Sequence, residues 1–160
     1  MTTRREARRT ALDILYQADI TDAQADVVLA DWREAGRTVT PFGQELIDGV
    51  RTHLPEIDPL LEEHSEGWTV ARMATLDRTI MRIAVFELMY RSDIPTSVAI
   101  SEAVEAATEL SSDESRRYVN GILGRIAREL GRPGTGPGTG QEIERGTEQE
   151  DQAATEVDAD

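Results

Sequence analysis

The segment LDRTIMRIAVFELMY, residues 76–90, decides the fold of this 160-residue chain. Its apolar residues cover almost the full circumference of a helix; they are Ile80, Met81, Ile83, Ala84, Val85, Phe86, Leu88 and Met89. A helix that is apolar almost all round is one that other elements surround. We therefore predict a central helix over residues 76–90 that forms the core of the domain.

Amphipathic segments lie on both sides of this central helix. Their apolar residues recur every three or four positions, which predicts helices, and the period-2 alternation of strands is nearly absent. The other predicted helices cover 4–19, 22–35, 40–54, a short segment beginning at 58–59, 97–110 and 114–130. The expected fold class is all-α: a single compact domain of about seven helices in two packed small helical bundles.

Residues favoured at helix ends predict some of the boundaries. Thr21 with Gln24, and Ser111 with Glu114, have the spacing of a capping box, so they should begin the second and the last helix. Gly36 should end the second helix, because glycine readily adopts the backbone conformation that follows a helix.

The composition divides the chain into a body and a tail. Residues 133–160 hold eight acidic residues, one arginine, five glycines and almost no large apolar side chain, so we predict a disordered acidic tail. Residues 1–132 hold 16 arginines against 23 acidic residues and form the predicted domain. Body and tail therefore contribute equally to the net charge of −14.

Several classes of protein are excluded by what the sequence lacks. There is no cysteine, no apolar run of membrane-spanning length and no secretion signal, so we expect a cytoplasmic protein that does not enter a membrane. His53 and His64 have no second ligand at helical spacing, so neither a metal site nor a cofactor is expected. No nucleophile, base and orienting group can be assembled, which indicates a binding protein and not an enzyme.

The first predicted helix carries a concentrated basic face. Arg4, Arg5, Arg8 and Arg9 fall within an arc of about 140° on a helical wheel, beside the apolar stripe, and Tyr16 lies between Arg5 and Arg9. We therefore expect the helix to pack on the bundle while all four arginines face solvent. Cations for phosphates and a ring for an unstacked base are what single-stranded RNA binding requires. The alternative is a solvated helix end whose tyrosine covers the edge of the core.

The last predicted helix has a glycine one turn beyond Tyr118. A mid-helix glycine costs about 1 kcal/mol relative to alanine, so the missing side chain of Gly121 should serve a purpose. Either it opens a flat shelf on which a base could lie, or Gly121 and Gly124 allow close helix packing.

Acidic residues suggest two further features. Glu102, Glu105 and Glu109 form a stripe that is either a solvated face or a surface for a basic protein partner. Asp77, next to Arg78, stands at the start of the central helix, where a negative charge is favourable for the helix dipole.

Three segments together resemble the NusB family of bacterial transcription antitermination factors. They are RREARRTALDILY (4–16), LDRTIMRIAVFEL (76–88) and IPTSVAISEAVEAATELSSDESRRYVNGIL (94–123). The combination of the patterns DRxxxRIAxxEL, PxxVAIxEAVE and YVNGxL, in this order, carries the resemblance, which covers about residues 3–131. It implies an all-helical fold and binding of single-stranded boxA RNA from ribosomal RNA leader transcripts.

The resemblance also implies partners and site residues. The RNA would be bound together with NusE, a small-subunit ribosomal protein, within an RNA polymerase antitermination complex that promotes ribosomal RNA transcription. The implied RNA contacts are Arg4, Arg5, Arg8, Arg9, Tyr16, Glu114, Arg116, Arg117 and Tyr118. Asp77 and Arg78 would lie on the side that meets NusE. We expect the first and last helices to be adjacent, so that one RNA strand crosses both.

Other interpretations stay open. The chain could be a helical adaptor that binds only protein, and the sequence leaves open whether it also forms a homodimer. A similar module opens certain ribosomal RNA cytosine methyltransferases, but this chain lacks the cofactor-binding domain that such an enzyme requires. The acidic tail could also compete with RNA for the arginine-rich helix.

Overall fold

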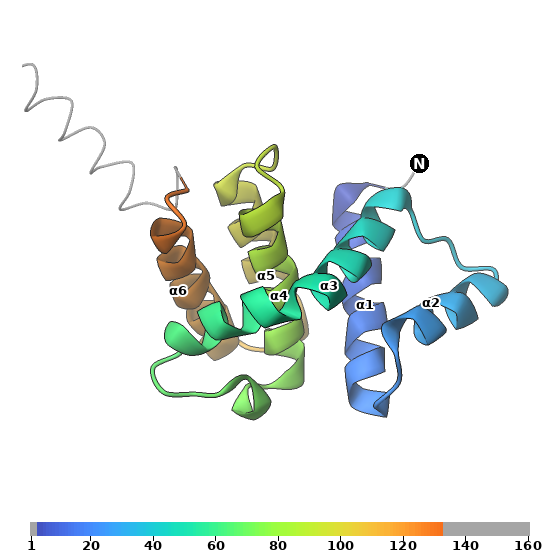
Figure 1. Ribbon diagram of the computed structural model, residues 1–160, viewed down its shortest axis with the longest axis horizontal. Coiled ribbons are helices and arrows are strands. Elements are labelled where there is room, and N and C mark those ends of the chain that lie inside the picture. Colours follow the sequence, from blue (N-terminus) through green and yellow to red (C-terminus); the bar gives the residue numbers. More distant parts are fainter. Residues whose placement is uncertain (1–2, 133–160) are drawn as a thin grey trace, which may run out of the picture.

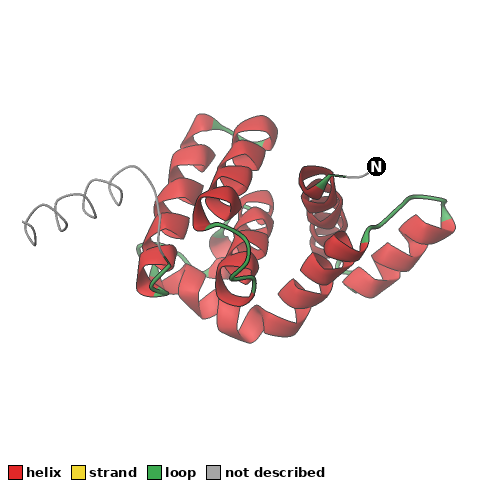
Figure 2. Cartoon of the chain, turned by 90° about the horizontal axis from the view of Figure 1, so that it is seen from above, coloured by secondary structure: helices red, strands yellow, loops and turns green. Residues whose placement is uncertain are grey.

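The computed structural model describes residues 3–132, and within them every regular element is helical (Figures 1 and 2). The elements are α1 (Arg4–Thr21), α2 (Ala25–Glu34), α3 (Pro41–Glu63), the 3₁₀ turn η1 (Val70–Arg72), α4 (Thr75–Tyr90), α5 (Thr96–Leu110) and α6 (Asp113–Glu129). The prediction of an all-α fold is confirmed. The predicted tail, residues 133–160, lies outside the described residues.

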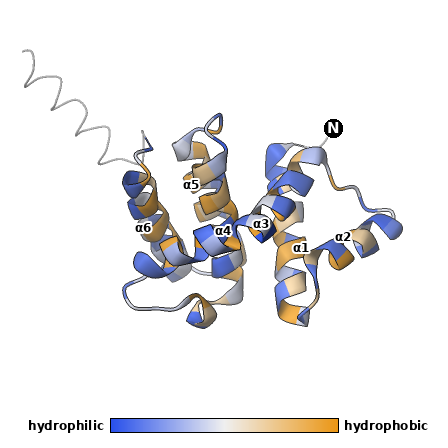
Figure 3. Ribbon diagram, in the orientation of Figure 1, coloured by the Kyte–Doolittle hydropathy of each residue, from blue (hydrophilic) through white to orange (hydrophobic). Residues whose placement is uncertain are grey.

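Helix α4 is the centre of the domain. It packs against α1, α3, α5 and α6, and from Thr79 to Leu88 only Arg82 is not buried. In Figure 1, α1 and α2 lie on one side, α5 and α6 on the other, and α3 runs across both. Apolar and polar segments alternate on these outer helices, as amphipathic packing requires (Figure 3). The prediction of a surrounded central helix is therefore confirmed.

Helix α3 is longer than predicted. It continues through Pro55 and Pro59, so the separate short helix expected at 58–59 is wrong. Each proline lacks the N–H that would bond four residues back, which normally interrupts a helix. Here Ile57 and Leu61, both fully buried, hold the second half of α3 against the core. The free energy gained by burying this apolar face outweighs the tendency of the prolines to interrupt the helix.

Two predicted helix starts are also wrong. The Thr21 hydroxyl donates to the carbonyl of Gln17, and α2 begins at Ala25 without a side-chain cap from Gln24. The last helix is capped by Ser112, one residue after the predicted Ser111. The predicted stop at Gly36 is confirmed, since this residue has a φ of 85°, a value that glycine adopts without strain.

Gly49 allows a side chain of α4 to approach α3 closely. A Cβ atom placed on Gly49 in α3 would lie 2.2 Å from Cε1 of Phe86 in α4, closer than any real contact. The missing side chain therefore leaves room for the Phe86 ring against α3. No helix among residues 3–132 is long and apolar enough to cross a membrane.

Candidate nucleic-acid interface

Helix α1 begins with a complete capping box. The Thr3 side chain accepts from the Glu6 N–H at 3.1 Å, and the Glu6 carboxylate accepts from the Thr3 N–H at 3.0 Å. Two N–H groups that would otherwise lack partners are satisfied. Glu6, the one acid within the basic run, thus fixes the start of the helix that carries the arginines.

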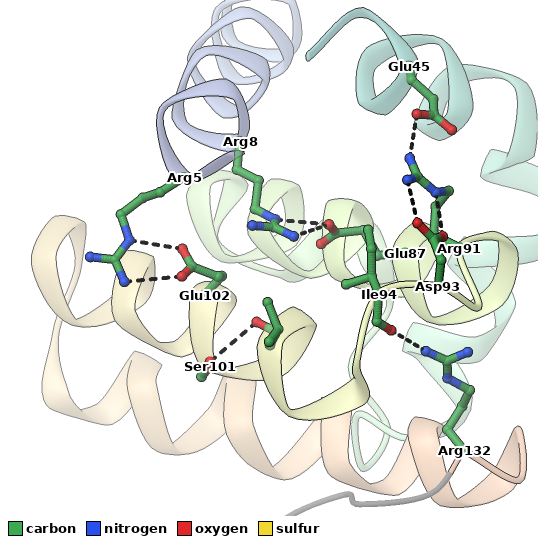
Figure 4. A network of polar contacts seen from close by, with 11 residues as sticks. Arg5, Arg8, Glu45, Glu87, Arg91, Asp93, Ile94, Ser101, Glu102 and Arg132 are labelled. Atoms are coloured by element: carbon green, nitrogen blue, oxygen red, sulfur yellow. Dashed lines mark hydrogen bonds and ion pairs between the residues drawn. The ribbon is translucent and has the colours of Figure 1, made fainter. Parts of the chain in front are cut away.

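Arg8 does not face outward as predicted. Only 9% of the residue is exposed, and its Nε donates to Oε1 of Glu87 in α4 at 2.9 Å (Figure 4). Its Nη2 lies 2.7 Å from the same oxygen. The helical wheel places Arg8 at the edge of the apolar stripe, close enough to the core for its guanidinium to pair with a buried acid on α4. The expectation that all four arginines turn to solvent is wrong for this residue.

Burial has an electrostatic cost at Glu87. This carboxylate is 1% exposed, and desolvation raises its pKa, while Arg8 acts in the opposite direction by hydrogen bonding and charge. The buried ion pair joins α1 to α4 and fixes the position of the basic face.

Arg5 and Arg9 bridge from α1 to the acidic stripe on α5. Arg5 donates from Nε and Nη2 to both oxygens of Glu102, at 3.2 and 3.1 Å, and from Nη2 to Glu105 at 2.8 Å. Arg9 donates to Glu109 at 2.5 Å. The acidic stripe is therefore neither a purely solvated face nor a surface open to a basic protein partner. Arginines of the same chain pair with its carboxylates. These contacts raise the pKa of Arg5.

Arg4 is exposed and shares an aromatic partner with two other arginines. The guanidinium carbons of Arg4, Arg8 and Arg91 lie 5.0, 5.3 and 5.3 Å from the centre of the Phe42 ring. Such distances suit cation–π attraction. Phe42, at the start of α3, is thus an aromatic centre of the basic region that sequence reasoning missed.

The first turns of α6 carry the second part of the candidate site. Glu114, Arg116 and Arg117 are exposed, and among the described residues neither of these arginines forms an ion pair. Tyr118 is half-buried, and desolvation, with a smaller effect of Asp77, raises the pKa of its phenol. A half-buried ring can still stack with a base through the part of its face that is exposed.

Gly121 is not explained by close packing. A Cβ atom there would meet only Nη1 of Arg125, at 3.4 Å and on the same helix. At Gly124 the nearest such atom is Nη1 of Arg128 at 3.9 Å. No atom of another helix lies within 4 Å of either Cβ position, so the packing interpretation is wrong, and the shelf beside Tyr118 stays a prediction.

Asp77 and Arg78 are tied into the fold. Asp77 is 6% exposed and accepts from the Ser115 hydroxyl of α6 at 2.9 Å, so it positions the first turn of that helix. Arg78 donates to the carboxylate of Asp19 in α1 at 2.5 Å and to the carbonyl of Val70 at 2.9 Å. Direct contact of either residue with a partner stays a prediction.

The first and last helices are not neighbours. Helix α6 packs mainly on α5 and α4, whereas α1 packs on α3, α4 and α2 (Figure 1). The expected adjacency is wrong because the central helix lies between them. The two candidate regions are connected indirectly: Arg9 pairs with Glu109 at the end of α5, and α6 begins four residues later at Asp113.

Tyr16 is half-buried on α1, and its contact with RNA also stays a prediction.

His64 is less isolated than the sequence indicated. Its Nε2 lies 2.9 Å from Oε2 of Glu129, 65 residues away, and Glu63 offers a third polar group within 4.8 Å. The contact lowers the pKa of Glu129 and joins the ends of α3 and α6.

Sequence reasoning missed the acidic partners of α1 as well as Phe42. One signal for Glu87 exists, because it is the only acid within the apolar run 79–90. A charge at that place requires a buried partner. Nothing in the local sequence indicates that Glu105 and Glu109 face α1, since this pairing depends on how the helices pack.

Comparison of the sequence with known proteins finds a matching family and close relatives. The model of the NusB family matches residues 5–128. The transcription antitermination protein NusB of Salinispora arenicola is 46% identical over 131 residues, which is 79% of this chain and 96% of the relative. That of Myxococcus xanthus is 40% identical and spans 83% of this chain and 100% of the relative.

Solved structures share the fold. T. maritima NusB has a TM-score of 0.72 and 32% identity, over 80% of this chain and 92% of that chain. A crystal structure of antitermination factors NusB and NusE in complex with dsRNA has a TM-score of 0.71 over 79% of this chain and 96% of that chain. Its 22% identity supports the shared fold alone.

Proposed function

The chain belongs to the NusB family of transcription antitermination proteins, and from this premise we propose that it binds single-stranded boxA RNA of ribosomal RNA leader transcripts together with NusE. Its role would be to promote processive transcription of ribosomal RNA in a cytoplasmic antitermination complex with RNA polymerase. This family role is one of binding and not of catalysis, which confirms the expectation that the chain is no enzyme.

The observation that carries the RNA-binding proposal is the start of α6. Arg116 and Arg117 are exposed beside the half-buried ring of Tyr118. Guanidinium groups neutralise phosphates, and the exposed face of an aromatic ring stacks with an unpaired base. An RNA strand held there could continue past the end of α5 toward Arg9 and Arg5, because the ion pair between Arg9 and Glu109 lies at that end.

A protein partner fits the charge of the molecule. The body is acidic overall, so its affinity for RNA without sequence preference should be low. A basic ribosomal protein would complement the acidic surface and extend the contact with RNA. We place this partner near the start of α4, where the buried Asp77 bonds to α6 and the half-buried Arg78 bonds to α1.

The test is an equilibrium titration of the full chain with a labelled boxA oligonucleotide, and with an RNA of the same composition in permuted order. Each is measured with and without NusE. We expect tighter binding of boxA, a gain when NusE is present, and a loss of affinity as salt rises. Equal affinity for both RNAs under every condition would contradict the proposal, and binding of NusE with no RNA binding would favour the adaptor. A change in affinity with protein concentration would reveal a homodimer that covers the RNA face.

A further inference from the structure

Three of the four arginines that should bind phosphate on α1, namely Arg5, Arg8 and Arg9, already have anionic partners. Arg5 and Arg9 reach across a groove between α1 and α5, whose walls also include Arg8, Glu87 and apolar residues of α4. The pairing follows the two helices in register: Arg5 contacts Glu102 and Glu105, and Arg9 contacts Glu109. The glutamates thus line one face of α5 directly opposite the basic face of α1 (Figure 4 shows Arg5 with Glu102).

We propose that Glu105 and Glu109 lower the affinity of the RNA site. Their carboxylates pair with the guanidinium groups of Arg5 and Arg9, and RNA phosphates must compete with them for these groups. This inference rests on the proposed function. An RNA strand gains contacts to Arg5 and Arg9 only by displacing carboxylates of the same chain. RNA that is not already bound elsewhere on the molecule therefore gains little from α1.

The exposure of these pairs shows that displacement is feasible. The side chains of Arg9 and Glu109 are 40% and 51% exposed, and those of Arg5 and Glu105 are 63% and 43% exposed. Exposed ion pairs contribute little stability and are screened by salt. Glu102, at 18%, is more enclosed and accepts two hydrogen bonds from Arg5, so it would hold that side chain in place while Glu105 is displaced.

The two parts of the site would then act in sequence. Arg116 and Arg117 on α6 have no acidic partner among the described residues, so they are free to bind RNA first. A strand held at α6 has a high effective concentration at the end of α5, where it can compete with Glu109. The correct RNA, which engages α6 through stacking, is thereby favoured over random RNA. The glutamates would lower affinity for all RNA but raise selectivity.

The test compares Glu105→Gln/Glu109→Gln with Asp31→Asn/Glu34→Gln. The second variant also removes two negative charges, but from exposed positions of α2, a helix that does not line the groove. Both are titrated with boxA RNA and with the permuted RNA, at several salt concentrations. Glutamine preserves size and polarity, so thermal stability should change little in either variant.

We expect the groove variant to bind boxA RNA about 3- to 10-fold more tightly than the wild type, and the control variant to change less than 2-fold. The permuted RNA should gain more than boxA RNA does, so that selectivity falls. Salt dependence should become steeper by about one phosphate contact. Glu109→Gln alone should give part of the gain. If the wild type binds boxA RNA but the groove and control variants gain equally in RNA affinity, this inference is overturned and the proposed function stands. Absence of boxA binding by the wild type, with and without NusE, would overturn the proposed function as well.

Discussion

Replacing Arg8 with methionine should destabilise the domain severely, because it leaves a buried charge without its partner. Glu87 is 1% exposed, and Arg8 is the only base that the structure places in hydrogen-bond contact with it among the described residues. Removing one member of a buried ion pair costs about 3 to 5 kcal/mol, since the remaining charge has neither water nor a counter-charge. For a domain of this size the melting temperature should fall by about 10 °C.

A double variant separates this cause from a simple loss of packing. Replacing both Arg8 and Glu87 with methionine removes the pair and the uncompensated charge together, so most of the stability should return. Urea unfolding followed by circular dichroism gives the free energy of unfolding for the wild type, both single variants and the double variant. Additive losses, with the double variant least stable of all, would refute the reasoning.

The pH dependence of the single variant gives an independent check. Burial already raises the pKa of Glu87, and loss of Arg8 should raise it further. A native carboxyl with a raised pKa binds its proton more tightly than the unfolded chain does, so stability falls as pH rises through its titration range. The deficit of Arg8→Met should therefore be large at pH 7.5 and smaller near pH 4.5. A deficit that does not change with pH would contradict this assignment of its cause.

Three further substitutions test separate parts of the account. Gly49→Ala should cost about 1 to 3 kcal/mol, measured by urea unfolding, because the new methyl group meets the Phe86 ring. Ser112→Ala should cost about 1 kcal/mol by the same assay, through loss of the cap that accepts from the Ser115 N–H. Tyr118→Ala should weaken boxA binding by about 5-fold or more with the fold intact, whereas Tyr118→Phe should bind normally; unchanged affinity of the alanine variant would count against stacking.

Much of the fold could be predicted from periodicity. The central helix and the amphipathic helices around it follow from the spacing of apolar residues, because burying those faces dominates the stability of a helical domain. Local signals were less dependable where tertiary packing competes with them. Pro55 and Pro59 indicated a break in α3, yet the buried residues beyond them keep that helix continuous.

The candidate site was harder to predict than the fold. The sequence shows that four arginines share a helix face, but their partners come from residues about 80 to 100 positions away. A helical wheel gives the direction of Arg8 only to within the width of the apolar stripe, which cannot decide between solvent and Glu87. For the same reason, the sequence could not reveal that α4 separates α1 from α6.

The most direct test of the central claim, that one RNA strand contacts both α1 and the start of α6, is a map of backbone amide chemical shifts. The ¹⁵N-labelled full chain would be titrated with boxA RNA. We predict that the largest changes fall in residues 4–16 and 112–121, with α2 unaffected. Changes confined to only one of these segments, or centred on α2, would contradict the account.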